Sequence, residues 1–136
     1  MRPHVVHHPA FVTPLPATHR FPMAKFGRLS EHLRETRLVD AARVVAPGLA
    51  PRPWLELAHS PAYVSAILGQ CLAQADERRL GLPLSPALAR RSRAASAGTL
   101  LAARLALEHG LACSTAGGSH HAFAAHGAGF CVFNDV

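Results

Sequence analysis

The feature that most constrains this chain is a long helix that runs into an apolar segment and then into a glycine-rich loop. Ser85 followed by Pro86 predicts a helix start, because serine caps the first turn and proline fits the first helical position. Gly110 predicts its end. Residues 111–116 are apolar and predict a short buried strand, and a glycine pair follows at 117–118. Since α/β proteins place their sites in loops at the carboxyl ends of strands, the sequence predicts an α/β fold with its site here.

The rest of the chain predicts a few further elements. A short strand is expected within residues 5–12, and an amphipathic helix over 22–39. A proline-glycine linker covers 46–53, and weak alternation over 54–58 predicts a second short strand. Residues 60–69 predict a helix that starts with a serine-proline pair. The inner face of the long helix is expected to consist of Leu88, Ala95, Gly98, Ala102 and Leu105.

Length and composition are those of one globular domain. The chain has 136 residues, of which 49% are hydrophobic and 16% are charged. That length is enough for one hydrophobic core and short for two. The first residues lack the apolar stretch of a secretory signal, and no apolar run approaches the roughly 20 residues of a membrane span. We therefore expect a cytoplasmic protein without membrane contact.

The chain is basic, with a formal net charge of +6 from thirteen arginines and one lysine against eight acids. A basic excess can indicate nucleic-acid binding when the cations gather on one face among aromatic residues. Here the arginines are scattered, with clusters only at 78–79 and 90–93, and aromatic residues are few. The pattern therefore favours solvated helix faces over a nucleic-acid surface.

Three cysteines, Cys71, Cys113 and Cys131, are far apart in the sequence and odd in number. This arrangement excludes a disulfide framework and lacks the paired spacing of a structural zinc site. We expect Cys71 and Cys113 to be buried thiols and Cys131 to be a half-buried thiol beside a pocket. The alternative for Cys131 is a nucleophile, which would need a neighbouring histidine to lower its pKa.

The adjacent histidines His120 and His121 are the main candidates for chemistry. Neighbours on an extended segment point to opposite sides, so they can share one site only if a tight loop redirects them, and the preceding glycine pair allows such a loop. Imidazole groups could then relay protons at neutral pH. Two alternatives remain: exposed loop histidines without a role, or a metal set completed by His126 or Cys131. The absence of His-x-His or Asp-x-His spacing disfavours the metal set.

Two motifs lie close together near residue 136: Gly-Gly-Ser-His-His-Ala at 117–122 and Gly-x-Gly-Phe-Cys-x-x-Asn-Asp at 127–135. They resemble motifs of the histone deacetylase superfamily of zinc-dependent deacetylases. Upstream segments that agree lie at 19–23, 57–64, 81–85 and 90–92. The likeness is to the bacterial branch related to class IV enzymes and covers essentially the whole chain. It implies that residues 1–136 are the N-terminal portion of an arginase/deacetylase fold, a parallel sheet flanked by helices, here truncated.

The resemblance also implies roles for individual residues. His120 and His121 would be the general base and acid pair in hydrolysis of an acetyl-lysine-like amide. Four residues would bind the substrate or line its path: Gly129, Phe130, Cys131 and Arg20. Gly129 and Phe130 would line a narrow tunnel around the acyl-lysine stem. Cys131 would lie near the acetyl end, and Arg20 near an internal channel behind the metal.

The same resemblance implies what these 136 residues lack. In the family the zinc ligands, a tyrosine that stabilises the oxyanion and the carboxylates behind the paired histidines lie downstream, so the chain itself is expected to hold no zinc ligand. Asn134 and Asp135 predict a helix cap without the helix, which suggests an interrupted sequence. We expect the chain alone to be inactive. Implied substrates are acetylated lysines, polyamines or small acetylated amines; the alternatives are a non-catalytic acyl-lysine-binding module or a decayed deacetylase remnant.

Overall fold

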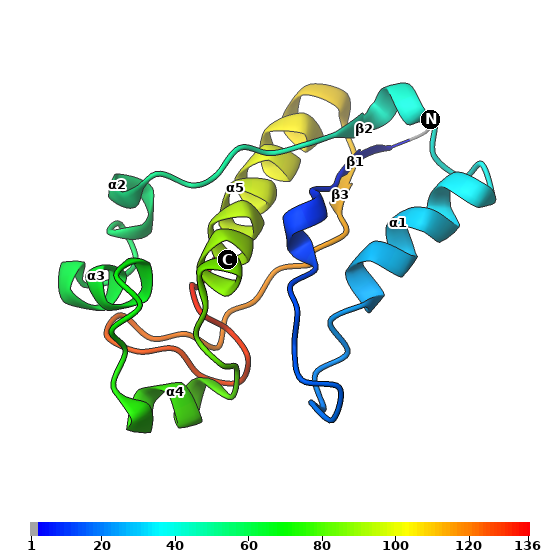
Figure 1. The fold of residues 1–136 in the computed structure, drawn as a ribbon. Coiled ribbons are helices and arrows are strands. Elements are labelled where there is room, and N and C mark those ends of the chain that lie inside the picture. The colour runs from blue at the N-terminus through cyan, green and yellow to red at the C-terminus, as the bar shows by residue number, and fades with distance from the viewer. Residues whose placement is uncertain (1–2) are drawn as a thin grey trace.

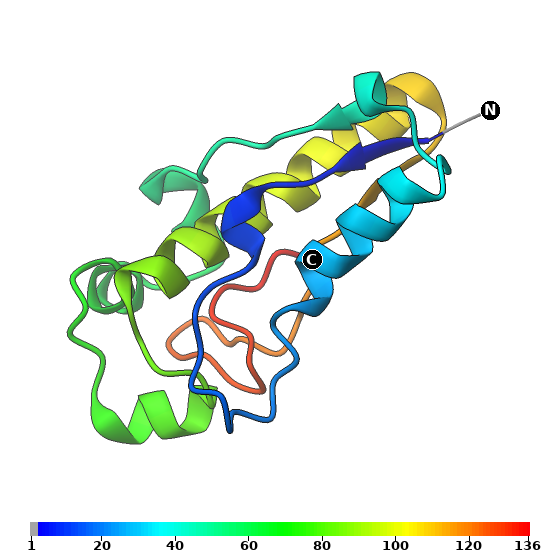
Figure 2. The ribbon, with the colours of Figure 1, turned by 45° about the vertical axis from the view of Figure 1, so that its right-hand side comes forward.

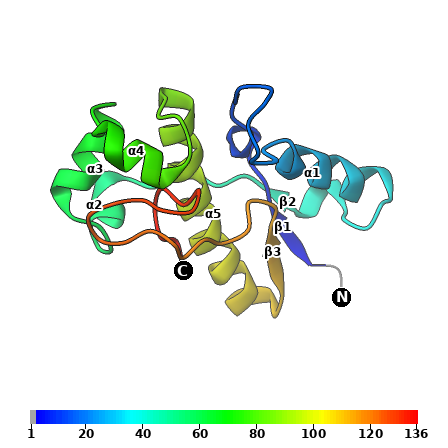
Figure 3. The same cartoon turned by 90° about the horizontal axis from the view of Figure 1, so that it is seen from below.

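The computed structural model describes residues 3–136, which form a small parallel sheet flanked by helices (Figure 1). Its three strands are β1 (His4–Val6), β2 (Val44–Val45) and β3 (Ala112–Ser114). They lie in the order β2-β1-β3, with Val5 of the central strand opposite Val44 and Cys113. Figure 3 shows α5 on one side of the strands and α1 on the other. The predicted fold class, α/β with a parallel sheet flanked by helices, is confirmed.

One α-helix lies between β1 and β2 along the chain, and four lie between β2 and β3. They are α1 (Lys25–Glu35), α2 (Arg52–Leu55), α3 (Pro61–Leu68), α4 (Gln74–Leu80) and α5 (Pro86–His109). Two short 3-10 helices, η1 (Pro9–Phe11) and η2 (Ala41–Arg43), precede and follow α1. Figure 2 shows α5, the longest of them, running along the strands. Among the described residues no helix has the length and apolar character needed to span a bilayer.

Helix α5 begins and ends where the sequence predicts. The Ser85 hydroxyl accepts the N–H of Leu88 at 3.0 Å, and Gly110 closes the helix in the left-handed conformation with a φ of 84°. The helix packs against β1, β3 and η1. At Gly98 the approach is close, since a Cβ there would lie 3.2 Å from Cζ of Phe11. A small residue is therefore needed where the helix crosses η1.

The predicted inner face of α5 is partly right. Leu88 and Gly98 are buried, whereas the other three members are only partly buried. The buried residues lie mostly in the first half of the helix, and Arg91 is one of them. The predicted linker at 46–53 lies along this half: Ala50 and Arg93 exchange two hydrogen bonds, of 3.1 Å between main-chain groups and 2.9 Å from the Arg93 guanidinium.

Apolar packing forms two clusters that meet along α5. One joins α3, α4 and the chain's last residues, and its fully buried members include Val64, Ile67, Leu80, Leu82 and Leu88. The other joins β1, η1 and α1 through Val6, Phe11, Met23, Phe26 and Ala94. The first cluster includes Val132 and Phe133, so the segment that follows the predicted site is part of the core.

Prolines start helical turns in both segments, so one predicted strand is shorter than expected and the other does not form. The strand expected within residues 5–12 ends at Val6, since His8 caps η1 by accepting the N–H of Ala10 at 2.9 Å. Residues 54–58 belong to the end of α2 and the turn after it, and they form no strand. Proline in the first turn of a helix fixes a helical φ, which overrides weak alternation.

The prediction that residues 111–116 form a buried strand is only partly right. β3 is a strand but covers only Ala112–Ser114, and it lies at the edge of the sheet. Leu111 is 51% exposed and Cys113 is also exposed. Cys71 is exposed as well, in the connection between α3 and α4. The expectation that Cys71 and Cys113 are buried thiols is therefore wrong.

The helix expected over residues 22–39 is shorter than predicted. It ends at Glu35, and Arg37 follows with a φ of 54° that no continuing helix allows. Phe26 faces the core, whereas Leu29 and Leu38 are exposed. The prediction included neither β2 nor α4, which are too short to show a clear hydrophobic period. The helix predicted from residue 60 is confirmed as α3.

Candidate active site

The loop after β3 carries both histidines of the predicted proton-transfer pair. Its start is anchored by the N–H of Thr115, which donates to the carbonyl of Val6 at 3.0 Å. Gly117 then turns the backbone with a φ of 67°. His120 and His121 are both exposed, with ring centroids 4.6 Å apart and planes inclined by 31°. The loop thus brings the two imidazoles together, as a shared proton-transfer site requires.

Asp135 fixes the residue immediately before these histidines. One of its carboxylate oxygens accepts the N–H of Ser119 at 2.6 Å, and the other accepts the hydroxyl of Thr99 at 2.7 Å. Thr99 lies on α5, so the carboxylate connects the histidine loop to the longest helix. The helix-cap geometry predicted here belongs instead to Asn134, whose side-chain oxygen accepts the N–H of Val136 at 3.2 Å. Asp135 supports the loop from behind.

The side chain of Asn134 supports the same loop from another direction. Its amide nitrogen donates to the carbonyls of His120 and Ala122, both at 3.3 Å. These two carbonyls flank His121, so the bonds fix the backbone on either side of that residue. The residues at 134–135 and the loop at 119–122 are therefore joined by side chains, with one main-chain bond between Asp135 and Ser119 at 3.2 Å.

A buried histidine, His59, lies beneath the loop. One ring nitrogen, Nδ1, is 2.9 Å from the carbonyl oxygen of Phe123, and the other, Nε2, accepts the N–H of Asn134 at 2.9 Å. The ring packs against Tyr63 and Phe133 at centroid distances of 5.5 and 5.3 Å. Burial lowers the pKa of His59 below its usual value, partly offset by the Phe123 carbonyl.

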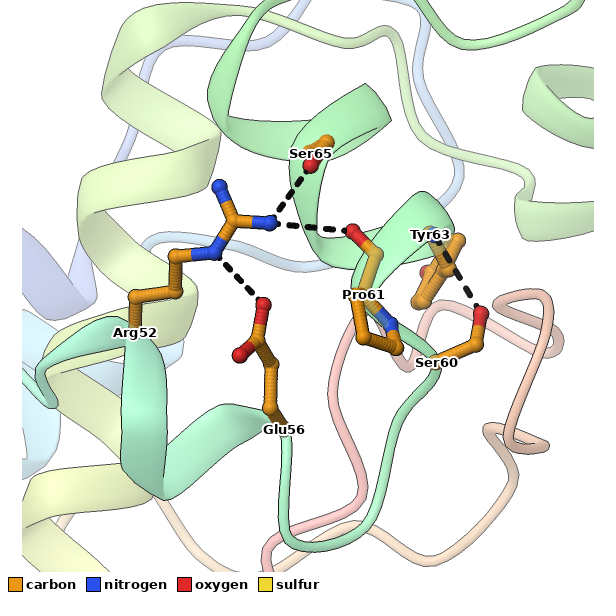
Figure 4. A network of polar contacts seen from close by, with 6 residues as sticks. All are labelled: Arg52, Glu56, Ser60, Pro61, Tyr63 and Ser65. Carbon is orange, nitrogen blue, oxygen red and sulfur yellow. Dashed lines mark hydrogen bonds and ion pairs between the residues drawn. The ribbon is translucent and has the colours of Figure 1, made fainter.

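The chain around His59 is held by a polar network between α2 and α3 (Figure 4). Arg52 donates to the carboxylate of Glu56, to the carbonyl of Pro61 and to the hydroxyl of Ser65. The Ser60 hydroxyl caps α3 by accepting the N–H of Tyr63 at 3.3 Å. The Arg52 bonds are exposed to solvent, so we ascribe to them orientation of the junction more than stability.

The predicted substrate residues Gly129 and Phe130 lie in a tight turn beside His121. Both have a positive φ, of 54° and 66°, and the Phe130 N–H donates to the carbonyl of Leu80 at 2.8 Å. A Cβ at position 129 would lie 3.4 Å from Cγ of His121. The imidazole therefore lies beside position 129, and a candidate proton carrier is next to the predicted substrate-binding turn.

Arg20 lies against the same turn. Its guanidinium carbon is 5.0 Å from the centroid of the Phe130 ring, and Phe21 approaches that ring at 5.0 Å. The Arg20 side chain is exposed, so this cation–π contact is worth about 0.5–1 kcal/mol. The structure thus brings Arg20, Gly129 and Phe130 together, as three of the four predicted substrate residues.

A cavity of about 490 Å³ lies behind the turn and the histidine loop. Residues from four segments line it: Phe21 and Phe26, Arg91 on α5, residues 114–119, and residues 129–133 with Asp135. Neither of the paired histidines nor Arg20 is among the lining residues, so these three lie outside it. Gly129, Phe130 and Cys131 form the shared wall between cavity and surface.

Arg91 is a buried charge that lines the cavity from α5, and it contradicts the expectation that the arginines cover solvated helix faces. It is 8% exposed, its Nε donates to the carbonyl of Phe11 at 3.0 Å, and its guanidinium lies 4.8 Å from the Phe26 ring. Burial lowers the pKa of Arg91, and the negative charge of Asp135 opposes the shift. The burial of Arg91 could not be predicted from the sequence, because Arg91 lies in a cluster that also contains the exposed Arg90.

Cys131 is fully buried, at 2% exposure, and not half-buried as predicted. Its Sγ donates to the carbonyl of Phe133 at 3.2 Å. A nucleophilic cysteine has to be an accessible thiolate, whereas this one is a buried thiol that donates its proton to a carbonyl. The nucleophile alternative therefore loses its basis, although Cys131 does lie beside a cavity as expected.

The metal set that the sequence left open is not assembled. Within residues 3–136 no group of three or more His, Cys, Asp or Glu side chains is arranged to hold a metal ion. His126 stacks on Phe123 at a centroid distance of 4.7 Å instead, with its Nδ1 3.2 Å from the carbonyl oxygen of Gly127. The alternative of a metal set completed by His126 or Cys131 therefore has no support among the described residues.

Besides Arg91, three side chains that support the histidine loop were not predicted from the sequence. They are His59, Thr99 and Asp135, the last as the acceptor for Ser119 and Thr99. His59 lies within the segment 57–64 that carries part of the family resemblance, which is the one signal that could have marked it. Its partners are 64 and 75 residues away in the chain. Contacts over such separations depend on the tertiary fold and leave no local pattern.

The chain is similar to known proteins over most of its length. The family described as the histone deacetylase domain matches residues 19–136. An uncharacterized protein of Picosynechococcus sp. is 51% identical over 132 residues, which are 97% of this chain and 44% of that protein. Histone deacetylase 2 of Arabidopsis thaliana is 29% identical over 124 residues, covering 87% of this chain and 32% of its own length.

A solved structure shows the same fold. The crystal structure of a histone deacetylase homologue from Aquifex aeolicus superimposes with a TM-score of 0.74 and 21% identity. It covers 99% of this chain, and this chain covers 39% of it. The chain thus spans less than half the length of each of these relatives. On the match to the family over residues 19–136, the chain belongs to the histone deacetylase domain family.

Proposed function

We propose that this chain forms the proton-transfer and acyl-lysine-binding side of a deacetylase site. The whole protein would hydrolyse an acetyl-lysine-like amide to an amine and acetate. The observation that supports this most is the position of His121, whose ring centroid is 4.6 Å from that of His120 and which lies close to the Gly129–Phe130 turn. Proton carriers and a binding turn for the substrate stem are thereby adjacent.

The paired histidines move protons in this proposal. One imidazole accepts a proton from the attacking water, and the other donates a proton to the nitrogen of the departing amine. Histidine is the side chain that most often carries out such transfers at neutral pH. The Asn134 bonds to the carbonyls of His120 and Ala122 keep both rings in place during the transfer, since they fix the backbone on either side of His121.

The substrate stem lies along the Phe130 ring. An aromatic face packs well against a methylene chain, and Gly129 leaves room beside it because it has no side chain. Arg20 and Phe21 hold the ring in one orientation. Cys131 is buried behind the turn, where it shapes the wall nearest the acetyl group. The substrate class is an acetylated lysine, polyamine or small acetylated amine.

The family resemblance implies zinc, but within residues 3–136 no group of three or more His, Cys, Asp or Glu side chains could hold it. The residues described do not fit the metal, so its ligands have to come from another segment. The roles assigned to this chain are therefore limited to proton transfer and binding. That residues 1–136 form the N-terminal portion of a deacetylase domain, and that the protein is cytoplasmic, both stay predictions.

A hybrid protein tests the proposal. Residues 1–136 would be joined to the part of the Picosynechococcus relative that follows its matched segment, loaded with zinc, and assayed for acetate release from an acetyl-lysine peptide. We expect turnover by the hybrid, none by the chain alone, and a loss of about 100-fold or more in His120→Ala and His121→Ala. The intact relative is the positive control. A folded, zinc-loaded hybrid without turnover, beside an active relative, would refute the proposal.

A second candidate is a binding module without catalysis. It is favoured by the preformed Gly129–Phe130 turn, which Arg20 and Phe21 hold. Calorimetry of the chain with an acetyl-lysine peptide and with the unmodified peptide, read together with the hybrid assay, distinguishes the binding module from the deacetylase. Binding of the acetylated peptide alone, combined with an inactive hybrid, would support the module and contradict the deacetylase.

A further inference from the structure

His59 bonds to both segments that enclose the paired histidines. Its Nδ1 reaches the carbonyl of Phe123, two residues after His121, and its Nε2 reaches the N–H of Asn134. Asn134 in turn holds the carbonyl of His120. The neighbouring Ser60 N–H donates to the carbonyl of Ala124 at 2.8 Å, so the entrance to α3 meets the loop at two successive residues.

The identity of the two partners determines the form of the ring. A backbone N–H can only donate, so the Nε2 of His59 must be the unprotonated acceptor for Asn134. A backbone carbonyl can only accept, so Nδ1 must carry the proton that is donated to Phe123. Only the neutral ring with its proton on Nδ1 satisfies both partners, and an imidazolium would break the bond to Asn134.

The environment of the ring agrees with this form. His59 is 4% exposed and lies between the rings of Tyr63 and Phe133. The Tyr63 hydroxyl is directed elsewhere, donating to the carbonyl of Val132 at 2.7 Å. A buried ring without an acidic partner favours its neutral state. The two main-chain bonds then select the tautomer.

We propose that His59, as the neutral Nδ1–H tautomer, is a positioning residue that holds the His120–His121 loop through Phe123 and Asn134. Its consequence for catalysis rests on the proposed function, because His59 touches neither substrate nor reacting atoms. The two hydrogen bonds that His59 makes to Phe123 and Asn134 do not depend on that function. If they are present, removing one of them should disturb one named segment and not the fold as a whole.

Two substitutions separate the bonds. In His59→Asn the side-chain amide nitrogen lies near the position of Nδ1, so the donor to Phe123 is kept and the acceptor for Asn134 is lost. In His59→Gln the amide oxygen reaches toward the position of Nε2, so the acceptor is kept and the donor is lost. Tyr63→Phe is the matched control, since it removes a buried hydrogen bond from the same cluster without touching the loop.

The test is nuclear magnetic resonance of the full chain with isotope-labelled histidine. We expect the nitrogen signals of His59 in the unmodified chain to show the proton on Nδ1 at neutral pH. We expect the amide of Asn134 to exchange about tenfold faster in His59→Asn than in His59→Gln, as the loss of one hydrogen bond implies. The ring-to-ring contact between His120 and His121 should weaken in both variants and persist in Tyr63→Phe.

Three results would overturn the proposal. One is a proton on Nε2, or a charged ring, in the unmodified chain at neutral pH. Another is unchanged exchange at Asn134 in His59→Asn, and the last is equal loss of the His120–His121 contact in Tyr63→Phe. The tautomer is read from the unmodified chain, so it decides the question even if a variant fails to fold. No turnover is measured, so an inactive hybrid protein would leave this result standing.

Discussion

The carboxylate of Asp135 accepts the backbone N–H of Ser119 at 2.6 Å, and this bond connects the end of the described chain to the residue before the paired histidines. The second oxygen of the same carboxylate accepts the Thr99 hydroxyl, so α5, the histidine loop and the segment at 134–135 meet at one side chain. Hydrogen bonds to an ionised carboxylate are among the stronger ones in proteins. The histidine loop is therefore supported by a charged group, although its own side chains are exposed.

Replacing Asp135 should destabilise the loop more than replacing its partner on α5. Asp135→Ala removes both acceptors and should lower the free energy of unfolding by about 1.5–3 kcal/mol, because two hydrogen bonds to the same carboxylate are lost together. Thr99→Val keeps the bond to Ser119 and should cost about 1 kcal/mol or less. Urea unfolding of the two variants measures the difference. Equal losses would show that the bond to Ser119 contributes nothing.

Gly129→Ala should strain the turn that lies beside His121. The φ of 54° costs an alanine about 1–2 kcal/mol, and its Cβ would lie 3.4 Å from Cγ of His121. We expect a lower midpoint of unfolding together with a changed chemical shift of the His121 ring. Gly48→Ala is the control, since a Cβ at that position meets nothing within 4 Å. A Gly129→Ala chain with an unshifted His121 signal would contradict the close approach described here.

How much of this fold the sequence could predict depends on how far apart the determining contacts lie. α3 and α5 were predictable because serine, proline and glycine cap them through bonds within four residues. β2 and α4 were not, since two and seven residues carry no clear period. The exposure of Cys113 was hidden for a related reason, because the sequence does not show which strand lies at the edge of the sheet.

In the candidate site, too, only the features that depend on neighbouring residues could be predicted from the sequence. The pairing of His120 and His121, and the neighbourhood of Gly129 and Phe130, were indicated by adjacent residues in one short segment. The support from His59 depends on partners 64 and 75 residues away. From the local sequence alone, a histidine beside a serine-proline helix start is expected to be an exposed polar residue. Only the packing of α3 under the loop makes it a buried donor and acceptor.

Arg91→Met should be strongly destabilising, whereas its neighbour should tolerate change. Arg91→Met leaves the carbonyl of Phe11 without its donor and removes the cation from the Phe26 ring. A buried acceptor that loses a charged donor costs about 1.5–3 kcal/mol. Arg90→Met, at an exposed position on the same helix, should lie within about 0.5 kcal/mol of the unmodified chain. Thermal unfolding of the pair tests the assignment, and equal midpoints would refute it.

Acidification should destabilise the chain through His59. Its pKa is lowered in the folded state, so below the ordinary value of 6.5 the unfolded chain binds a proton that the folded chain does not. The free energy of unfolding should therefore be constant with respect to this group above about pH 7 and fall as the pH drops below 6.5. His7, whose pKa burial also lowers, contributes in the same direction.

Substitution separates the His59 contribution from the rest of this pH dependence. Stability curves from pH 8 to 5 should be less steep in His59→Gln than in the unmodified chain, since the group that takes up the proton on unfolding is gone. Tyr63→Phe should lower the whole curve without changing its slope in this range, because burial raises the pKa of Tyr63 further above it. If His59→Gln kept the slope of the unmodified chain, His59 would not be the neutral buried ring that its two main-chain partners require.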